Sequence, residues 1–98
     1  MSIDVELKHI SSIISTTEEG KFKVDEIQNH IDKVWQIINN KRRVLNDIMI
    51  NRICKVITKL AIIVDAYKAR MVRFESLKLY IEKEGLATDL IELSQNIS

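Results

Sequence analysis

The chain has 98 residues, which is enough for one domain and too few for two independent hydrophobic cores. Hydrophobic residues make up 46% and charged residues 30% of the sequence, a balance that is typical of folded domains and excludes a disordered chain. The net charge of +1 excludes a protein that is strongly basic or acidic as a whole. Because the chain has no proline, two glycines and one cysteine, a turn-rich β fold and an intrachain disulfide are excluded as well.

The first two predicted elements are amphipathic helices. Apolar residues at helical spacing predict one helix over residues 3–15, and polar residues with Gly20 then break the pattern over residues 15–20. The apolar face of this helix comprises Ile3, Leu7, Ile10 and Ile14. A second helix is expected from residue 22 to about residue 38, because its apolar residues recur at spacings of three and four. These residues are Val24, Ile27, Ile31, Val34 and Ile38.

The second helix is expected to end near residues 39–42, where two asparagine side chains compete for backbone hydrogen bonds; the pair Asn46-Asp47 is the alternative. A third helical pattern then runs from about residue 43 to residue 84, and Gly85 suits a C-cap. At 1.5 Å per residue this helix would reach roughly 60 Å. It therefore either kinks near residues 66–70 or extends beyond the core and is covered by another chain. A short last helix is expected to begin at Thr88-Asp89.

The pattern as a whole predicts an all-α protein with a single domain over residues 1–98. We expect a small bundle of three to four helices, one of them long, basic and amphipathic. Between Leu60 and Val64 this long helix is apolar almost all the way round, which is typical of a helix at the centre of an assembly. We therefore expect a homodimer or a complex with a protein partner. The predicted oligomer or partner seam comprises Leu60, Ile63, Tyr67, Met71 and Phe74.

Charge is unevenly distributed along the chain. Residues 1–40 carry four bases and seven acids, for a charge of −3, and residues 74–98 carry two bases and five acids, again −3. Between them, residues 41–73 carry nine bases and two acids, for a charge of +7. On an ideal helix, five of the other bases fall within about 40° of Lys41. They form a predicted basic stripe of Lys41, Arg52, Lys55, Lys59, Arg70 and Arg73.

The basic stripe has three interpretations. It is a binding surface for nucleic acid or an acidic protein, a solvated flank of the core, or a surface paired with the acidic first 40 residues of the same or a neighbouring chain. If the helix kinks, the stripe divides into two patches, 52–59 and 70–73. The aromatic residues Tyr67, Phe74 and Tyr80 fall towards the apolar face, which argues against base stacking. Any nucleic-acid contact is therefore expected to be non-specific and made to the backbone.

Residues with catalytic or metal-binding chemistry are few. Glu6 and His9 have the E-x-x-H spacing of di-iron bundles, but such bundles need two of these motifs and two further glutamates. His30 follows Glu26 by four residues, so it does not repeat the motif. We interpret Glu6 and His9 as a surface pair and expect no metal and no cofactor. Because the motifs of phosphate-binding loops, zinc sites and nucleophilic enzymes are missing as well, we expect no enzymatic activity.

The N-terminal residues lack the pattern of a signal peptide, and no apolar run approaches the roughly 20 residues that a membrane span needs. We therefore expect a cytoplasmic protein without membrane contact. The leading hypothesis for its function is a non-enzymatic accessory subunit of a larger complex. One form of this hypothesis places the subunit in a complex that processes nucleic acid. Its apolar seam would bind a protein partner, and its basic stripe would contact nucleic acid or an acidic protein surface. The alternative is a dedicated protein-binding chaperone, or an inhibitor or immunity-type protein, with no nucleic-acid contact.

Overall fold

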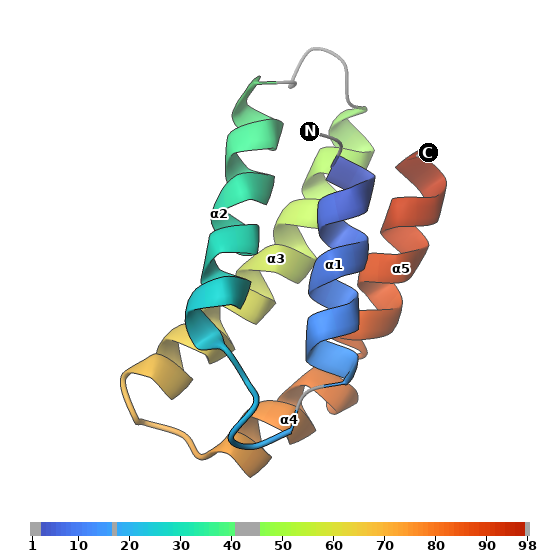
Figure 1. Cartoon of the computed structure of the whole chain (residues 1–98). Coiled ribbons are helices and arrows are strands. Elements are labelled where there is room, and N and C mark those ends of the chain that lie inside the picture. The colour runs from blue at the N-terminus through green and yellow to red at the C-terminus, as the bar shows by residue number, and fades with distance from the viewer. Residues whose placement is uncertain (1–2, 17, 41–45, 98) are drawn as a thin grey trace.

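The computed structural model describes residues 3–16, 18–40 and 46–97. Within these ranges the chain forms five helices and no strand, which confirms the all-α prediction. The helices are α1 (Ile3–Ser15), α2 (Val24–Asn40), α3 (Asp47–Lys68), α4 (Phe74–Lys83) and α5 (Leu86–Ile97). Four of them run along the bundle, and α4 lies across the end opposite to both termini (Figure 1). The molecule is elongated, with principal extents of 39 × 21 × 19 Å.

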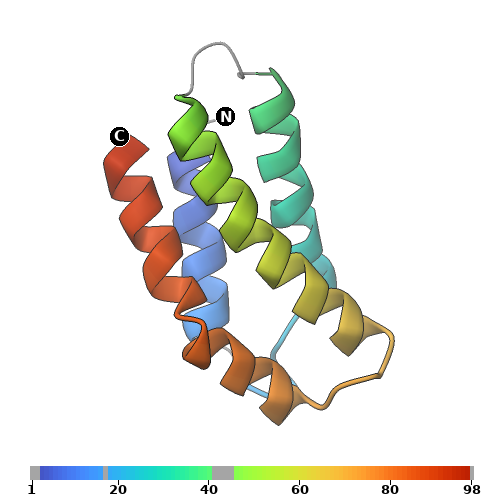
Figure 2. The same ribbon diagram turned by 180° about the vertical axis from the view of Figure 1, so that it is seen from behind.

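The hydrophobic core runs through the whole bundle and receives side chains from every helix. Each helix contributes at least one fully or almost fully buried residue, and representative ones are Leu7, Ile31, Leu60, Leu77 and Leu90. The apolar faces predicted for the first two helices are confirmed, because their members are buried except for the partly buried Val24. Seen from behind, α3 lies in front, between α2 and α5 (Figure 2). Ile48 and Ile62 of α3 are each 61% exposed, so burial within this chain accounts for only part of the apolar surface of this helix.

The prediction of one helix over residues 43–84 is wrong. α3 ends at Lys68, the chain turns over residues 69–73, and α4 begins at Phe74 on a different course. The turn lies at the edge of the region where a kink was the alternative. Five helices therefore replace the three or four that were predicted, and no described helix extends beyond the core. Because no described helix overhangs, the length of the helices gives no reason to expect a second chain that covers one.

The remaining boundaries agree with the sequence to within a few residues. α2 ends at Asn40, inside the predicted break at residues 39–42, although residues 41–45 lie outside the described ranges. The alternative break also has a role, because the Asn46 side chain accepts a hydrogen bond of 2.8 Å from the Ile48 backbone N–H and caps α3. Gly85 follows the end of α4 with a φ of 62°, as a C-capping glycine should. α5 begins at Leu86, slightly before the predicted start.

Candidate functional site

The predicted basic stripe falls into two patches that face different parts of the molecule. Arg52, Lys55 and Lys59 are exposed on α3, and we call them the α3–α5 basic patch. Lys68, Arg70 and Arg73 surround the turn between α3 and α4, and we call them the basic turn. Lys41 lies outside the described residues. The division follows from the end of α3 at Lys68, which removes the later bases from the helix that would have aligned them.

The α3–α5 basic patch lies among acidic side chains. Its three bases line a shallow cavity of about 330 Å³ together with Asp89 and Glu92 of α5. The Lys59 Nζ also lies 3.9 Å from the Glu84 Oε2, a distance at the limit of an ion pair. One of the three interpretations paired the stripe with acids of residues 1–40, but the acids beside this patch lie in residues 84–92. One of the three bases is therefore paired within the chain, and two further acids share the same hollow.

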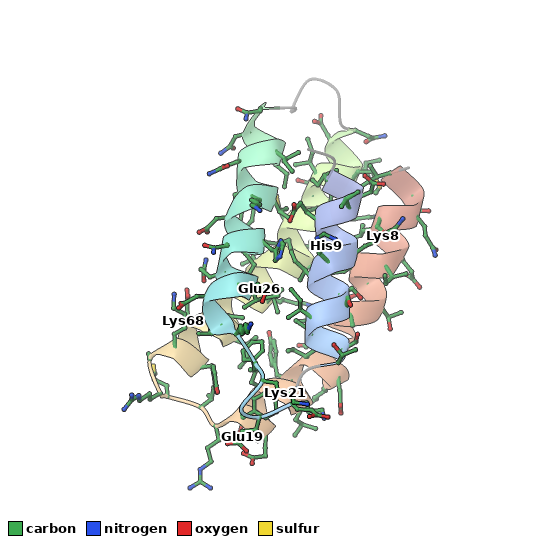
Figure 3. All side chains as sticks on the ribbon, in the orientation of Figure 1. Lys8, His9, Glu19, Lys21, Glu26 and Lys68 are labelled. Atoms are coloured by element: carbon green, nitrogen blue, oxygen red, sulfur yellow. The ribbon has the colours of Figure 1, made fainter. Side chains whose placement is uncertain are left out.

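The basic turn has different surroundings. Its three cationic side chains line an open hollow of about 550 Å³, whose other walls are Val24, Tyr67, Met71 and Val72. All three are exposed, and none of them makes an ion pair with any residue that the structure describes. Lys68 lies at the end of the bundle that also carries Glu19 and Lys21 (Figure 3). This end of the molecule therefore presents three free cations around one concave surface.

The backbone of the basic turn is held in a defined conformation. Arg70 has a φ of 61°, the left-handed region that favours glycine. The Arg70 N–H donates to the Tyr67 carbonyl at 3.0 Å, and the Met71 N–H donates to the Ala66 carbonyl at 2.9 Å. These two bonds are the Schellman motif, which satisfies carbonyls at the end of a helix. The motif fixes the direction in which the chain leaves α3, and so it fixes where Arg70 and Met71 stand.

Three aromatic rings support the turn from the side of the core. Phe22, Tyr67 and Phe74 contact one another edge to face, with ring centroids 5.6, 6.0 and 6.3 Å apart. Such pairs contribute about 0.5–1.5 kcal/mol each beyond the area that they bury. Because the rings come from the α1–α2 linker, α3 and α4, they tie three segments together at this end of the bundle. The hollow of the basic turn is thus built on a packed base.

The predicted partner seam is mostly used inside the chain. Leu60, Ile63 and Phe74 are buried in the core of this one chain, and Tyr67 is partly buried in the aromatic cluster. Only Met71 is strongly exposed, with 79% of its surface accessible. As a correction to the sequence analysis, the first three residues already have intramolecular neighbours. Of the predicted seam, Met71 alone remains fully available, and it stands in the basic turn.

The structure also assembles a set of groups that could hold a metal ion. Glu6 and His9 of α1 and His30 of α2 each offer one ligand atom, and these atoms all lie within 4.8 Å of one another. We call these three residues the Glu6–His cluster. The interpretation of Glu6 and His9 as a surface pair is wrong for Glu6, which is buried and bonded to His30. No signal in the sequence marked His30 as its neighbour, because a separation of 24 residues carries no spacing signal. The packing of α2 beside α1 is what brings His30 to them.

The comparisons with known proteins do not add a family. No protein-family model, no curated protein and no solved structure matches this chain. Within the described part of the chain, no helix combines the length and the apolar character that a membrane crossing requires. The functional argument therefore depends on the surface chemistry of this molecule alone.

Proposed function

We propose that this chain is a non-enzymatic interaction subunit that contacts an anionic macromolecule through the basic turn. The observation that carries the proposal is the contrast in pairing. Acids share the hollow of the α3–α5 basic patch, and Lys59 of that patch pairs with Glu84, whereas the three cations of the basic turn form no ion pair with any described residue. An unpaired arginine offers a planar fork of N–H donors that fits phosphate or carboxylate oxygens in pairs.

Among anionic partners, the proposal favours the phosphate backbone of a nucleic acid. Three cations on one end of the molecule can each contact a phosphate along a nucleic-acid strand. Contacts with phosphates do not need a side chain that recognises the edges of the bases. The aromatic rings near the turn support this form of contact, because Phe74 is buried and Tyr67 is packed against Phe22, which leaves neither free to stack on bases. We therefore expect weak, sequence-independent binding, with a dissociation constant on the order of 10⁻⁴–10⁻⁶ M at physiological salt.

A protein partner is the second candidate function, and exposed Met71 favours it. Methionine is flexible and polarizable, and it is common on surfaces that bind varied apolar groups. A chaperone or inhibitor-type protein would use Met71 for an apolar contact and the surrounding cations for acidic residues of its target. Replacing Met71 with glutamine separates the two candidates, because it would weaken a protein contact and leave phosphate contacts almost unchanged.

The test compares two variants with the same net charge. R70E/R73E changes the basic turn, and R52E/K55E changes the α3–α5 basic patch. Each substitution lowers the charge by two, so both variants carry −3 instead of the wild-type +1. Fluorescence anisotropy with a labelled DNA duplex at about 50 mM salt is expected to show binding to the wild type that R70E/R73E weakens about tenfold or more.

The R52E/K55E control is expected to stay close to the wild type, because its positions are already surrounded by acids. Circular dichroism on both variants checks that the helices are retained. Equal losses in the two variants would mean that only the overall charge matters. No binding by the wild type at this salt concentration would exclude nucleic acid as the partner.

A further inference from the structure

We propose that the Glu6–His cluster is a binding site for a divalent transition-metal ion of the zinc type. The proposal is independent of the basic turn, because the cluster lies on the facing sides of α1 and α2. Figure 3 shows His9 on the side of α1 next to α2, and Lys8, its neighbour in the sequence, on the α5 side. Three potential ligands therefore converge from two helices on one point of the bundle.

The buried carboxylate of Glu6 is the first argument for a cation at this point. Glu6 is only 4% exposed, and burying an ionised carboxylate costs several kcal/mol unless a cation or hydrogen-bond donors compensate. Its hydrogen-bonding partner is the His30 ring, whose Nδ1 lies 2.6 Å from the Glu6 Oε2. Among the described residues, no lysine or arginine forms an ion pair with Glu6. Besides the His30 ring, a metal ion would supply a positive charge beside this carboxylate.

The ligand types select the class of metal. Two imidazoles and one carboxylate suit zinc and neighbouring first-row ions, whereas calcium and magnesium prefer sites made of oxygen ligands. Glu6 and His9 are three residues apart, so one helical face presents both. His30 completes the set from α2, with its ring centroid 5.6 Å from that of His9. The same combination of ligands occurs in zinc enzymes and in non-haem iron sites.

Metal binding requires only a small rearrangement of these side chains. Ligand atoms 2.0–2.1 Å from a tetrahedral ion stand about 3.3 Å apart, so the 2.6 Å contact between Glu6 and His30 would widen. To bind the ion through its Nδ1, His30 would be a neutral imidazole whose one ring proton is on Nε2, so the Nδ1 contact with Glu6 would be replaced by metal ligation. The other ligand separations would shorten from at most 4.8 Å, which rotation of the exposed His9 side chain can supply. Three protein ligands leave a further coordination position for water or for a group of a partner.

His9 distinguishes this proposal from a purely structural pair of Glu6 and His30. A structural pair would link α1 to α2 with or without His9, which is exposed. A metal site needs His9 as its third ligand. The variant H9A is therefore expected to remain folded and to lose metal affinity, whereas a variant at buried Glu6 would affect folding as well.

The experiment measures Zn²⁺ binding by isothermal titration calorimetry in a C54S background, which removes the chain's one thiol. We expect one ion per chain, and at least a tenfold loss of affinity in H9A with an unchanged circular dichroism spectrum. Co²⁺ supplies a second readout, because visible absorption bands report nitrogen and oxygen ligation at a four- or five-coordinate site. E26Q is the matched control, since it removes a carboxylate one turn before His30 that is not part of the cluster.

Three results would overturn the proposal. The first is no saturable Zn²⁺ binding at protein concentrations of about 100 μM, where even a weak site with micromolar affinity would fill. The second is equal affinity in wild type and H9A, which would place the ion elsewhere. The third is one ion per two chains with a doubled mass in solution, which would make the site intermolecular. An affinity in E26Q close to that of the wild type supports the assignment to these three residues.

Discussion

The α3–α5 basic patch and the basic turn contain the same kinds of side chain. All of their bases except Lys68 were predicted to lie on one stripe, which a kink would divide. They differ in what the rest of the fold brings to them. α5 places acids beside the first patch, whereas the bases of the second form no ion pair with any residue that the structure describes. Both regions also expose apolar side chains, with Ile48 and Ile62 on α3 and Met71 in the basic turn. Whether a base is free to bind therefore depends on tertiary packing more than on its position along a helix.

The largest expected effect contrasts the apolar residues of these two regions. Leu60 is fully buried in the core behind the α3–α5 basic patch, so L60A is expected to lower the free energy of unfolding by about 2–5 kcal/mol. M71A is expected to change it by less than about 0.5 kcal/mol, because Met71 is a surface residue of the basic turn. Urea denaturation followed by circular dichroism measures both values.

This pair of variants also tests whether the chain folds as a monomer. If L60A and M71A were equally destabilising, and the loss depended on protein concentration, both residues would belong to an interface between chains. Such a result would restore the predicted seam as an oligomer contact. The structure instead assigns Leu60 to the core of a single chain.

A smaller effect is expected from the backbone of the basic turn. A non-glycine residue in the left-handed region destabilises the folded state by about 1–2 kcal/mol. Glycine removes this cost, but it loses more conformational entropy on folding, which costs about 0.5–1 kcal/mol. R70G is therefore expected to raise the free energy of unfolding by up to about 1 kcal/mol while it weakens anion binding. The measurement combines urea denaturation with the duplex-binding assay. A gain in stability with a loss of binding would indicate that arginine is retained at this position for contact rather than for folding.

R73G is the matched control for this change. It removes the same charge, but Arg73 has an ordinary extended backbone with a φ of −83°, so glycine relieves no strain there. Arg73 is the N-cap of α4 and makes no side-chain cap bond, and glycine is well tolerated at that position, so we expect R73G to change stability by less than about 0.5 kcal/mol. If R70G were no more stable than R73G, the left-handed conformation of Arg70 would be contradicted.

The comparison of two helix ends shows how far sequence reasoning could reach. Gly85 and Arg70 both follow a helix in the left-handed conformation, with φ values of 62° and 61°. The first was predicted, because glycine is the usual residue at that position. The second could not be, because arginine gives no such signal and the hydrophobic spacing continues through it. The long predicted helix was wrong for this reason, and the positions of α1 and α2, which have clear apolar faces, were right.

The candidate sites show the same limit of prediction from sequence. The sequence identified Arg70 and Arg73 as part of a basic stripe, but Lys68 joins them only because the chain turns after α3. It did not identify the acids of α5 as neighbours of the first patch, since they lie about 30 residues further along the chain. The sequence also did not identify His30 as a neighbour of Glu6, because the two residues are 24 positions apart in the chain. Contacts between helices depend on how the helices pack against one another, and the spacing of residues along one helix does not predict that packing.

The most direct test of the central claim is the salt dependence of duplex binding. If each cation of the basic turn neutralises one phosphate, log K against log salt concentration should have a slope of about −2.7 for the wild type. R70Q should reduce the magnitude of that slope by about one, and R52Q in the α3–α5 basic patch should leave it unchanged. This result would assign the contact to the basic turn. Equal reductions by R70Q and R52Q, or a slope near zero in the wild type, would contradict the account.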